Sequence, residues 1–144
     1  MKREFKTALE KRRIIPFPEG KRLVNRELDA ARDDLAEAHD RFSKKRFKYA
    51  TITAYYAMFH AARALLYARG YREKSHHYLI VSIEALYVHE KKLSPELARD
   101  LRNAMILREE ADYHGDFSES GAKVILDSAA RFLETAVDLL KGEN

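Results

Sequence analysis

Cysteine and tryptophan are absent from this chain of 144 residues, which also has only five glycines and three prolines. Without cysteine there are no disulfide bonds, no thiolate catalysis and no cysteine-ligated zinc or iron–sulfur sites. So few turn-forming residues cannot supply the many short connections of a β-sandwich or barrel. Because alanine, leucine, lysine, arginine and glutamate are abundant, the composition favours one all-helical domain around a single core.

Long uncharged apolar runs are missing as well. Residues 14–17, the only apolar cluster near the start, are too short for a signal-peptide core. The most apolar later stretch, residues 50–68, is interrupted by His60 and Arg63 and falls short of the ~18 uncharged residues of a spanning helix. We therefore expect no secretion and no membrane span, and a cytoplasmic location.

Positive charge is concentrated at the N-terminus, although the net charge of the whole chain is only +4. Residues 1–22 contain eight lysines and arginines and three glutamates, a local charge of +5, whereas the rest carries 19 positive and 20 negative residues. We interpret residues 1–20 as a basic arm, which Pro16, Pro18 and Gly20 prevent from forming one continuous helix. Such an arm contacts nucleic acid phosphates, is solvated, or wraps around a neighbouring subunit.

Beyond the arm, apolar residues recur at alternating steps of four and three, the pattern of helices packed lengthwise. Five helices are predicted: from Val24 to Phe42, from about Tyr49 to Arg69, after a cap at Ser75, from Pro95 toward His114, and from Asp116 or Ser118 to Gly142. The connections are short, so consecutive helices are antiparallel. We predict an all-α fold, a five-helix up-down bundle with a four-helix core over residues 21–142.

Two local signals in this pattern are specific. The helix around residues 50–68 carries an alanine at every step of one stripe, which predicts a buried helix with close backbone approach. The run Ser94-Pro95-Glu96 combines an N-cap serine, a first-turn proline and a first-turn acid, and it marks a helix start. Gly70 is a candidate left-handed C-terminal cap.

An arginine interrupts the apolar stripe of the fourth predicted helix, at Arg108. A guanidinium cannot escape burial by losing its proton, so it needs a carboxylate, carbonyls, a phosphate or a subunit boundary with water. Asp112, one turn later, is a candidate partner in a structural ion pair. His114 follows six positions after the arginine, about 120° around a straight helix and ~9 Å along it. A joint site needs a bend near Gly115 or two copies of the chain facing each other across a twofold axis.

Two segments carry a resemblance to a known family: AYYAMFHAARALL from Ala54 to Leu66, and LREEADYH from Leu107 to His114. Together they resemble the HEPN superfamily, small prokaryotic all-helical domains often encoded beside a minimal nucleotidyltransferase. The similarity covers roughly residues 20–140, and it identifies residues 21–142 as a HEPN-like bundle. The superfamily's signature is an arginine, four to six residues and a histidine, matched here by Arg108 and His114.

The resemblance implies a metal-independent endoribonuclease that acts as a homodimer and, as the toxin of a toxin–antitoxin pair, is restrained by a nucleotidyltransferase. His114 would transfer protons and Arg108 would hold the phosphate, leaving a 2′,3′-cyclic phosphate and a 5′-hydroxyl. Tyr113 either positions the phosphate or is a packed aromatic residue. Glu109 stands where many active members have asparagine, aspartate or histidine. Asp112 is the middle residue of an Ala-Asp-Tyr sequence, residues 111–113, which resembles a branch of the superfamily that often lacks the histidine of the signature.

A different class of function also fits the residues. In this alternative the chain is a non-catalytic dimeric module that binds a partner protein or a nucleotide, and Arg108 and Asp112 form a structural ion pair. The remaining histidines are weaker candidates: His60 is expected to be a hydrogen-bonded core residue, and His76, His77 and His89 lack the spacing of metal ligands. We expect neither a metal nor another cofactor.

Overall fold

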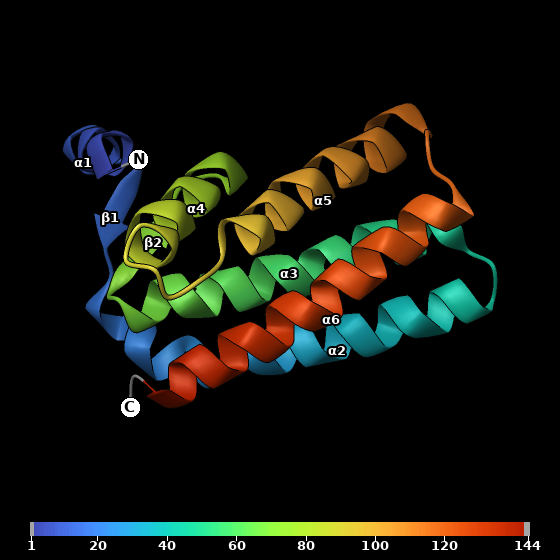
Figure 1. The fold of residues 1–144 in the computed structure, drawn as a ribbon, viewed down its shortest axis with the longest axis horizontal. Helices are drawn as coiled ribbons and strands as arrows, with labels where there is room; N and C mark the ends of the chain where they lie inside the picture. Colours follow the sequence, from blue (N-terminus) through green and yellow to red (C-terminus); the bar gives the residue numbers. More distant parts are fainter. Residues whose placement is uncertain (1, 143–144) are drawn as a thin grey trace.

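The structure, a computed structural model, describes residues 2–142 and is predominantly helical, as predicted (Figure 1). Its elements in chain order are α1 (Lys2–Glu10), β1 (Ile14–Pro16), the 3₁₀ helix η1 (Pro18–Leu23), α2 (Val24–Ser43), α3 (Phe47–Ala68), β2 (Tyr71–Glu73), α4 (His76–Ile83), the π-helical turn η2 (Glu84–Val88), α5 (Pro95–His114) and α6 (Glu119–Gly142). The described residues thus contain six α-helices, one more than the five predicted, because the segment before Pro16 forms α1. No helix within the described residues is long and apolar enough to cross a membrane.

Helix α3 lies at the centre of the bundle, with α2, α5 and α6 packed along it (Figure 1). Of its 22 residues 14 are buried, which makes it the most buried helix of the described chain, as its sequence predicts. The alanine stripe is completely buried along most of its length, since Ala50, Ala54, Ala57, Ala61 and Ala64 have no exposed surface. Small side chains let the neighbouring helix backbones approach closely here.

Serine side chains that accept hydrogen bonds from backbone N–H groups define the starts of α5 and α6. The Ser94 hydroxyl accepts from the backbone N–H three residues on, at 3.2 Å, so the predicted N-cap is confirmed. The Ser118 hydroxyl likewise accepts a hydrogen bond from the backbone N–H of Gly121, at 2.9 Å, so Ser118 and not Asp116 caps α6. Two glycines turn the chain where the helices end: φ is 80° at Gly70 and 63° at Gly115, values that side chains disfavour.

The N-terminal segment folds back onto its own chain. Helix α1 packs against α4, where Phe5, Ala8 and Ile14 form a second, smaller apolar cluster with Val81 and Ala85. Strand β1 pairs antiparallel with β2, with Ile14 opposite Glu73 and Pro16 opposite Tyr71. The apolar side of the segment is therefore buried against its own chain, whereas its lysines and arginines from residue 3 onward are exposed.

Candidate functional site

Helix α5 holds Arg108 in the interior of the bundle, as the position of this arginine in an apolar stripe predicts. Leu101, Ala104 and Ala111 on the same stripe are buried, and Arg108 itself is only 6% exposed. A charge this deeply placed must be compensated by neighbouring groups, because removal from water disfavours it. The contacts of the guanidinium therefore determine what the site can bind.

Three tyrosine rings surround the guanidinium of Arg108. Its central carbon lies 5.3 Å from the ring centroid of Tyr55, 5.9 Å from that of Tyr56 and 5.5 Å from that of Tyr113. Cation–π attraction at these distances stabilises the positive charge without neutralising it. Nη1 donates a hydrogen bond to the Tyr113 hydroxyl at 3.2 Å, and Nε is buried without a hydrogen-bond partner among the described residues. Tyr55, Tyr56, Arg108 and Tyr113 are called the tyrosine cage below.

The predicted ion pair between Arg108 and Asp112 is present but loose. The Asp112 carboxylate lies 3.8 Å from Nη1, and its side chain is 42% exposed. Solvent screens such a pair, so it contributes little to stability. Burial has the largest single effect on the pKa of Arg108 and lowers it, but the hydrogen bond to Tyr113 and the electrostatic effects of the three tyrosines together outweigh it, so the pKa is raised. The guanidinium therefore stays charged, with only part of its charge answered by a carboxylate.

A histidine outside the predicted site lies behind the tyrosine cage. His76, at the start of α4, shares a hydrogen bond with the Tyr55 hydroxyl through Nδ1, and its ring stacks on Phe59 with centroids 4.6 Å apart. Burial lowers the pKa of His76, and the positive charge of Arg108 lowers it further. Burial also raises the pKa of Tyr55, so both groups are neutral at pH 7. His76 therefore supports Tyr55 as an uncharged hydrogen-bond partner.

His114 is the last residue of α5 and is exposed. Within residues 2–142 no hydrogen bond or ion pair joins it to Arg108, so the single chain brings Arg108 and Tyr113 together but leaves His114 apart. Tyr113 is 68% exposed in the single chain, and its ring and hydroxyl both contact the guanidinium of Arg108. Glu109 is half-buried beside the arginine.

Exposed apolar side chains flank this site. Ile106 is 49% exposed and Phe117 48%, and Ile106 lies on the same face of α5 as Tyr113, two turns earlier. Large apolar side chains that gather beside a functional residue are typical of contact surfaces.

Elsewhere, His60 forms the hydrogen bond expected of it, with Glu27 at 2.9 Å. The described residues contain no group of three or more histidines and carboxylates arranged to hold a metal ion.

Comparisons with known proteins agree with this architecture. A family model described as HEPN domain matches residues 24–141. A UPF0332 protein of Archaeoglobus fulgidus is 36% identical over 105 residues, 69% of this chain and 81% of that protein. A Methanocaldococcus jannaschii protein named "Putative toxin MJ0605" is 30% identical over 115 residues, 79% of this chain and 86% of the relative.

The fold is also found in a solved structure. The crystal structure of TT1696 from Thermus thermophilus matches with a TM-score of 0.64, covering 81% of this chain and 97% of that chain. The sequence identity is 22%, so this match supports the arrangement of the helices and no further property.

Proposed function

Because this chain belongs to the HEPN domain family, we propose that it is a metal-independent endoribonuclease of a toxin–antitoxin pair, active as a homodimer. The observation that carries the proposal is the buried, charged Arg108, whose Nε lacks a partner among the described residues and whose nearest carboxylate is loose and exposed. A guanidinium with unused donors and positive charge is suited to a phosphate diester. The names of relatives such as the M. jannaschii protein favour a toxin.

Each residue of the motif has a role in this reaction. Arg108 binds the scissile phosphate and stabilises the charge that develops on its oxygens. His114, exposed at the helix end, is accessible to RNA and either takes the proton from the ribose 2′-hydroxyl or gives one to the leaving 5′-oxygen, and water carries out the other proton transfer. The internal 2′-oxygen attacks phosphorus and the bond to the 5′-oxygen breaks. The products are a 2′,3′-cyclic phosphate and a 5′-hydroxyl. Tyr113, whose hydroxyl already contacts Arg108, orients the phosphate.

A homodimer completes the site. Arg108 and His114 point to different faces of α5, whereas two copies related by a twofold axis line one cleft with both motifs. The exposed apolar residues Ile106, Tyr113 and Phe117 provide an interface beside the motif. The proposed antitoxin is a nucleotidyltransferase that binds or modifies this surface. The family resemblance supports that partner.

The deciding experiment is RNA cleavage by the purified protein in EDTA. We expect His114→Ala to lose about 10²- to 10⁴-fold in rate with an unchanged thermal melting profile, since an exposed side chain contributes little to packing. His39→Ala is the matched control, because His39 is an exposed helical histidine on α2. Equal rates for the wild type and both variants would refute the proposal. Absence of cleavage by the wild type would favour the non-catalytic module with a structural Arg108–Asp112 pair.

The dimer is tested separately by analytical ultracentrifugation at micromolar concentration. Ile106→Glu places a charge in the proposed interface and should shift the protein to monomers with loss of cleavage. Val124→Glu is the matched control, because Val124 is an exposed apolar residue on α6, 59% exposed. A wild-type monomer, or a dimer that withstands the change at Ile106, would contradict the proposed arrangement.

A further inference from the structure

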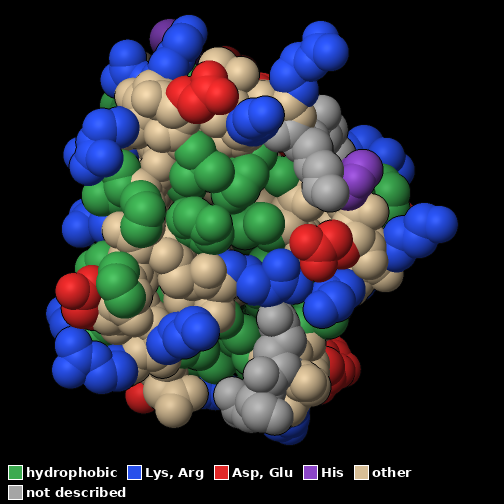
Figure 2. Space-filling view, turned by 90° about the vertical axis from the view of Figure 1, so that its left-hand side faces the viewer, with side chains coloured by type: hydrophobic (Ala, Val, Ile, Leu, Met, Phe, Trp, Pro, Cys, Tyr) green, Lys and Arg blue, Asp and Glu red, His purple; other side chains and the backbone are tan. Residues whose placement is uncertain are grey.

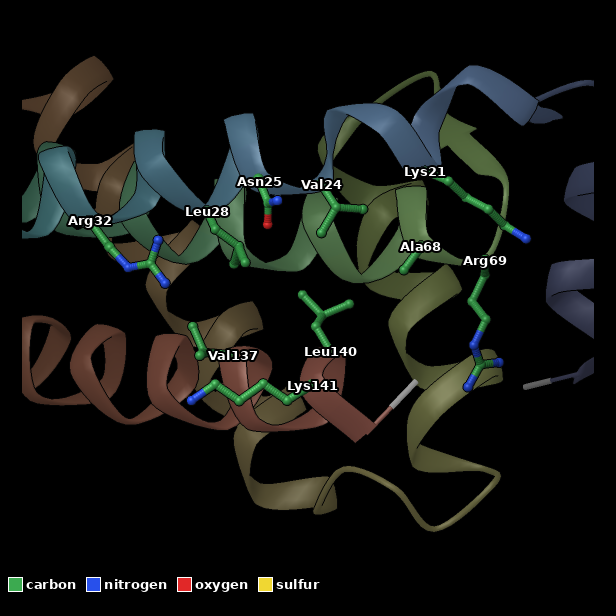
Figure 3. Close-up of a pocket in the computed structure, with 10 residues that line it drawn as sticks. All are labelled: Lys21, Val24, Asn25, Leu28, Arg32, Ala68, Arg69, Val137, Leu140 and Lys141. Atoms are coloured by element: carbon green, nitrogen blue, oxygen red, sulfur yellow. The ribbon is translucent and has the colours of Figure 1, made fainter. Parts of the chain in front are cut away.

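A cavity of about 570 Å³ lies far from Arg108, between α2 and α6 and above the end of α3 (Figure 3). It is at the end of the bundle where α6 finishes, whereas Arg108 lies toward the opposite end of α5 (Figure 1). This volume is within the range of pockets that hold small organic molecules. None of the residues of the tyrosine cage lines it.

The interior of the cavity is apolar and its rim is cationic. The apolar part is formed by aliphatic side chains from three helices: Val24, Leu28, Ala68, Val137 and Leu140. Lys21, Arg32, Arg69 and Lys141 are the charged residues of the lining, and no aspartate or glutamate of the described chain takes part in it. Figure 2 shows lysines and arginines around apolar side chains on the left-hand end of Figure 1, toward which the cavity lies.

Two of these cations have carboxylate partners at the edge of the cavity. Arg32 pairs with Asp29 at 3.2 Å and Arg69 with Glu90 at 3.5 Å, and neither carboxylate belongs to the lining. Arg32 and its partner are both well exposed, so this pair compensates the positive charge only weakly. The cavity therefore attracts anions.

The cations are divided between the two ends of the cavity. In Figure 3 the side chains of Arg32 and Lys141 reach toward one end, and those of Lys21 and Arg69 lie at the other. Val24 and Leu140 are between them, Val137 lies beside Arg32 and Lys141, and the Asn25 amide points into the space from α2. An occupant that satisfies this arrangement has an anion at each end and an apolar body between them.

We propose that this cavity binds a small organic molecule with a flat or aliphatic body and phosphate groups at two ends. A terminal phosphate carries a charge near −2 and three acceptor oxygens, which two cations at each end can share. The aliphatic side chains cover the body, and Asn25 offers a donor and an acceptor to a polar edge. The site involves none of the residues assigned to RNA cleavage, so the proposal is independent of that function.

Calorimetric titration of the intact protein tests the proposal with three probes. 1,6-Hexanediol bisphosphate has both the apolar body and an anion at each end, 1,6-hexanediol has the body alone, and inorganic phosphate has the anion alone. We expect the bisphosphate to bind at least about tenfold more tightly than either, and to weaken as salt is added. Binding of the bisphosphate no tighter than inorganic phosphate would refute the two-ended site.

Substitutions locate the binding on the molecule. Lys141→Glu and Lys21→Glu should each lower the affinity for the bisphosphate about tenfold or more, and Val137→Phe should abolish binding by filling the interior. Lys45→Glu is the control, because it makes the same charge change at the exposed turn between α2 and α3, at the opposite end. An equal loss in Lys45→Glu, or full affinity in Val137→Phe, would overturn the assignment.

Two further measurements keep the outcomes distinguishable. The melting profile of each variant shows that it is folded, which is expected because Lys21, Lys45 and Lys141 are exposed and Val137 is only half-buried. Bisphosphate binding by His114→Ala should equal that of the wild type. If the protein cleaves no RNA but binds the bisphosphate as described, the proposed function fails and this inference stands.

Discussion

Replacing Arg108 by methionine separates the two roles that an arginine in an apolar stripe can have. Methionine keeps an unbranched side chain of similar length and favours helix, but it removes the charge and all five donors. If Arg108 belongs to a structural ion pair, the substitution should strongly destabilise the fold, because breaking a buried pair costs about 3–5 kcal/mol. If Arg108 instead binds a ligand, the Arg108→Met variant should stay folded but lose its activity.

The contacts of Arg108 indicate a small cost. The variant loses cation–π contacts worth about 0.5–1 kcal/mol each, up to ~2 when desolvated, and one hydrogen bond to a charged group worth about 1.5–3 kcal/mol. The variant also avoids the unfavourable free energy of burying a charge, which is several kcal/mol. Asp112 is not left buried, because its side chain is 42% exposed. These terms nearly cancel, so we expect the free energy of unfolding to change by only about 1 kcal/mol.

Urea denaturation and the RNA-cleavage assay are run on the same preparations of wild type and Arg108→Met. The expected result is near-normal stability with cleavage lost. Arg108→Ala is expected to lose cleavage too, but also ~2–3 kcal/mol of stability, because it leaves a void beneath the tyrosine rings. Loss of more than about 3 kcal/mol in Arg108→Met, the range of a broken buried pair, or cleavage at the wild-type rate, would refute this reasoning.

Two further predictions concern the fold and its dependence on pH. Ala57→Leu and Ala61→Leu should each lower the free energy of unfolding by about 1–3 kcal/mol in urea titrations, because neither alanine has exposed surface and three extra carbon atoms have no space. Unchanged midpoints would show that the helices can separate at this stripe. The lowered pKa of His76 means that the unfolded chain binds more protons just below pH 6.5, the ordinary value, so stability should fall as the pH decreases from there. Titrations between about pH 5.5 and 7.5 should show a weaker decrease in His76→Phe, and an identical decrease would contradict the assignment.

The sequence predicts the helices well where the boundary signal is local. The cap at Ser94 and the left-handed Gly70 each depend on a few adjacent residues, so they can be recognised without knowing the fold. The pairing of β1 with β2 is different, because three-residue strands joined across more than 50 positions leave no periodic pattern. The sequence pattern does not indicate the π-helical turn after α4 or the separate helix α1, for a similar reason. They depend on packing against the rest of the bundle.

The candidate site, too, can be predicted from the sequence only in part. The position of Arg108 in an apolar stripe predicts its burial, and the ion pair with Asp112 follows from helical spacing. The role of Tyr55 and Tyr56 as ring partners depends on how α3 and α5 pack, and that of His76 on where β2 delivers the start of α4. These side chains come from three separate segments. Only the folded chain brings them together around one guanidinium.

The pairing of β1 with β2 also affects how this protein can be shortened. The HEPN match begins at residue 24, and a fragment cut there would lack both α1 and β1. Such a fragment would expose Val81 and Ala85 and leave β2 with an unpaired backbone edge, two features that promote aggregation. We expect the smallest soluble, independently folding piece of this chain to retain the residues before the match.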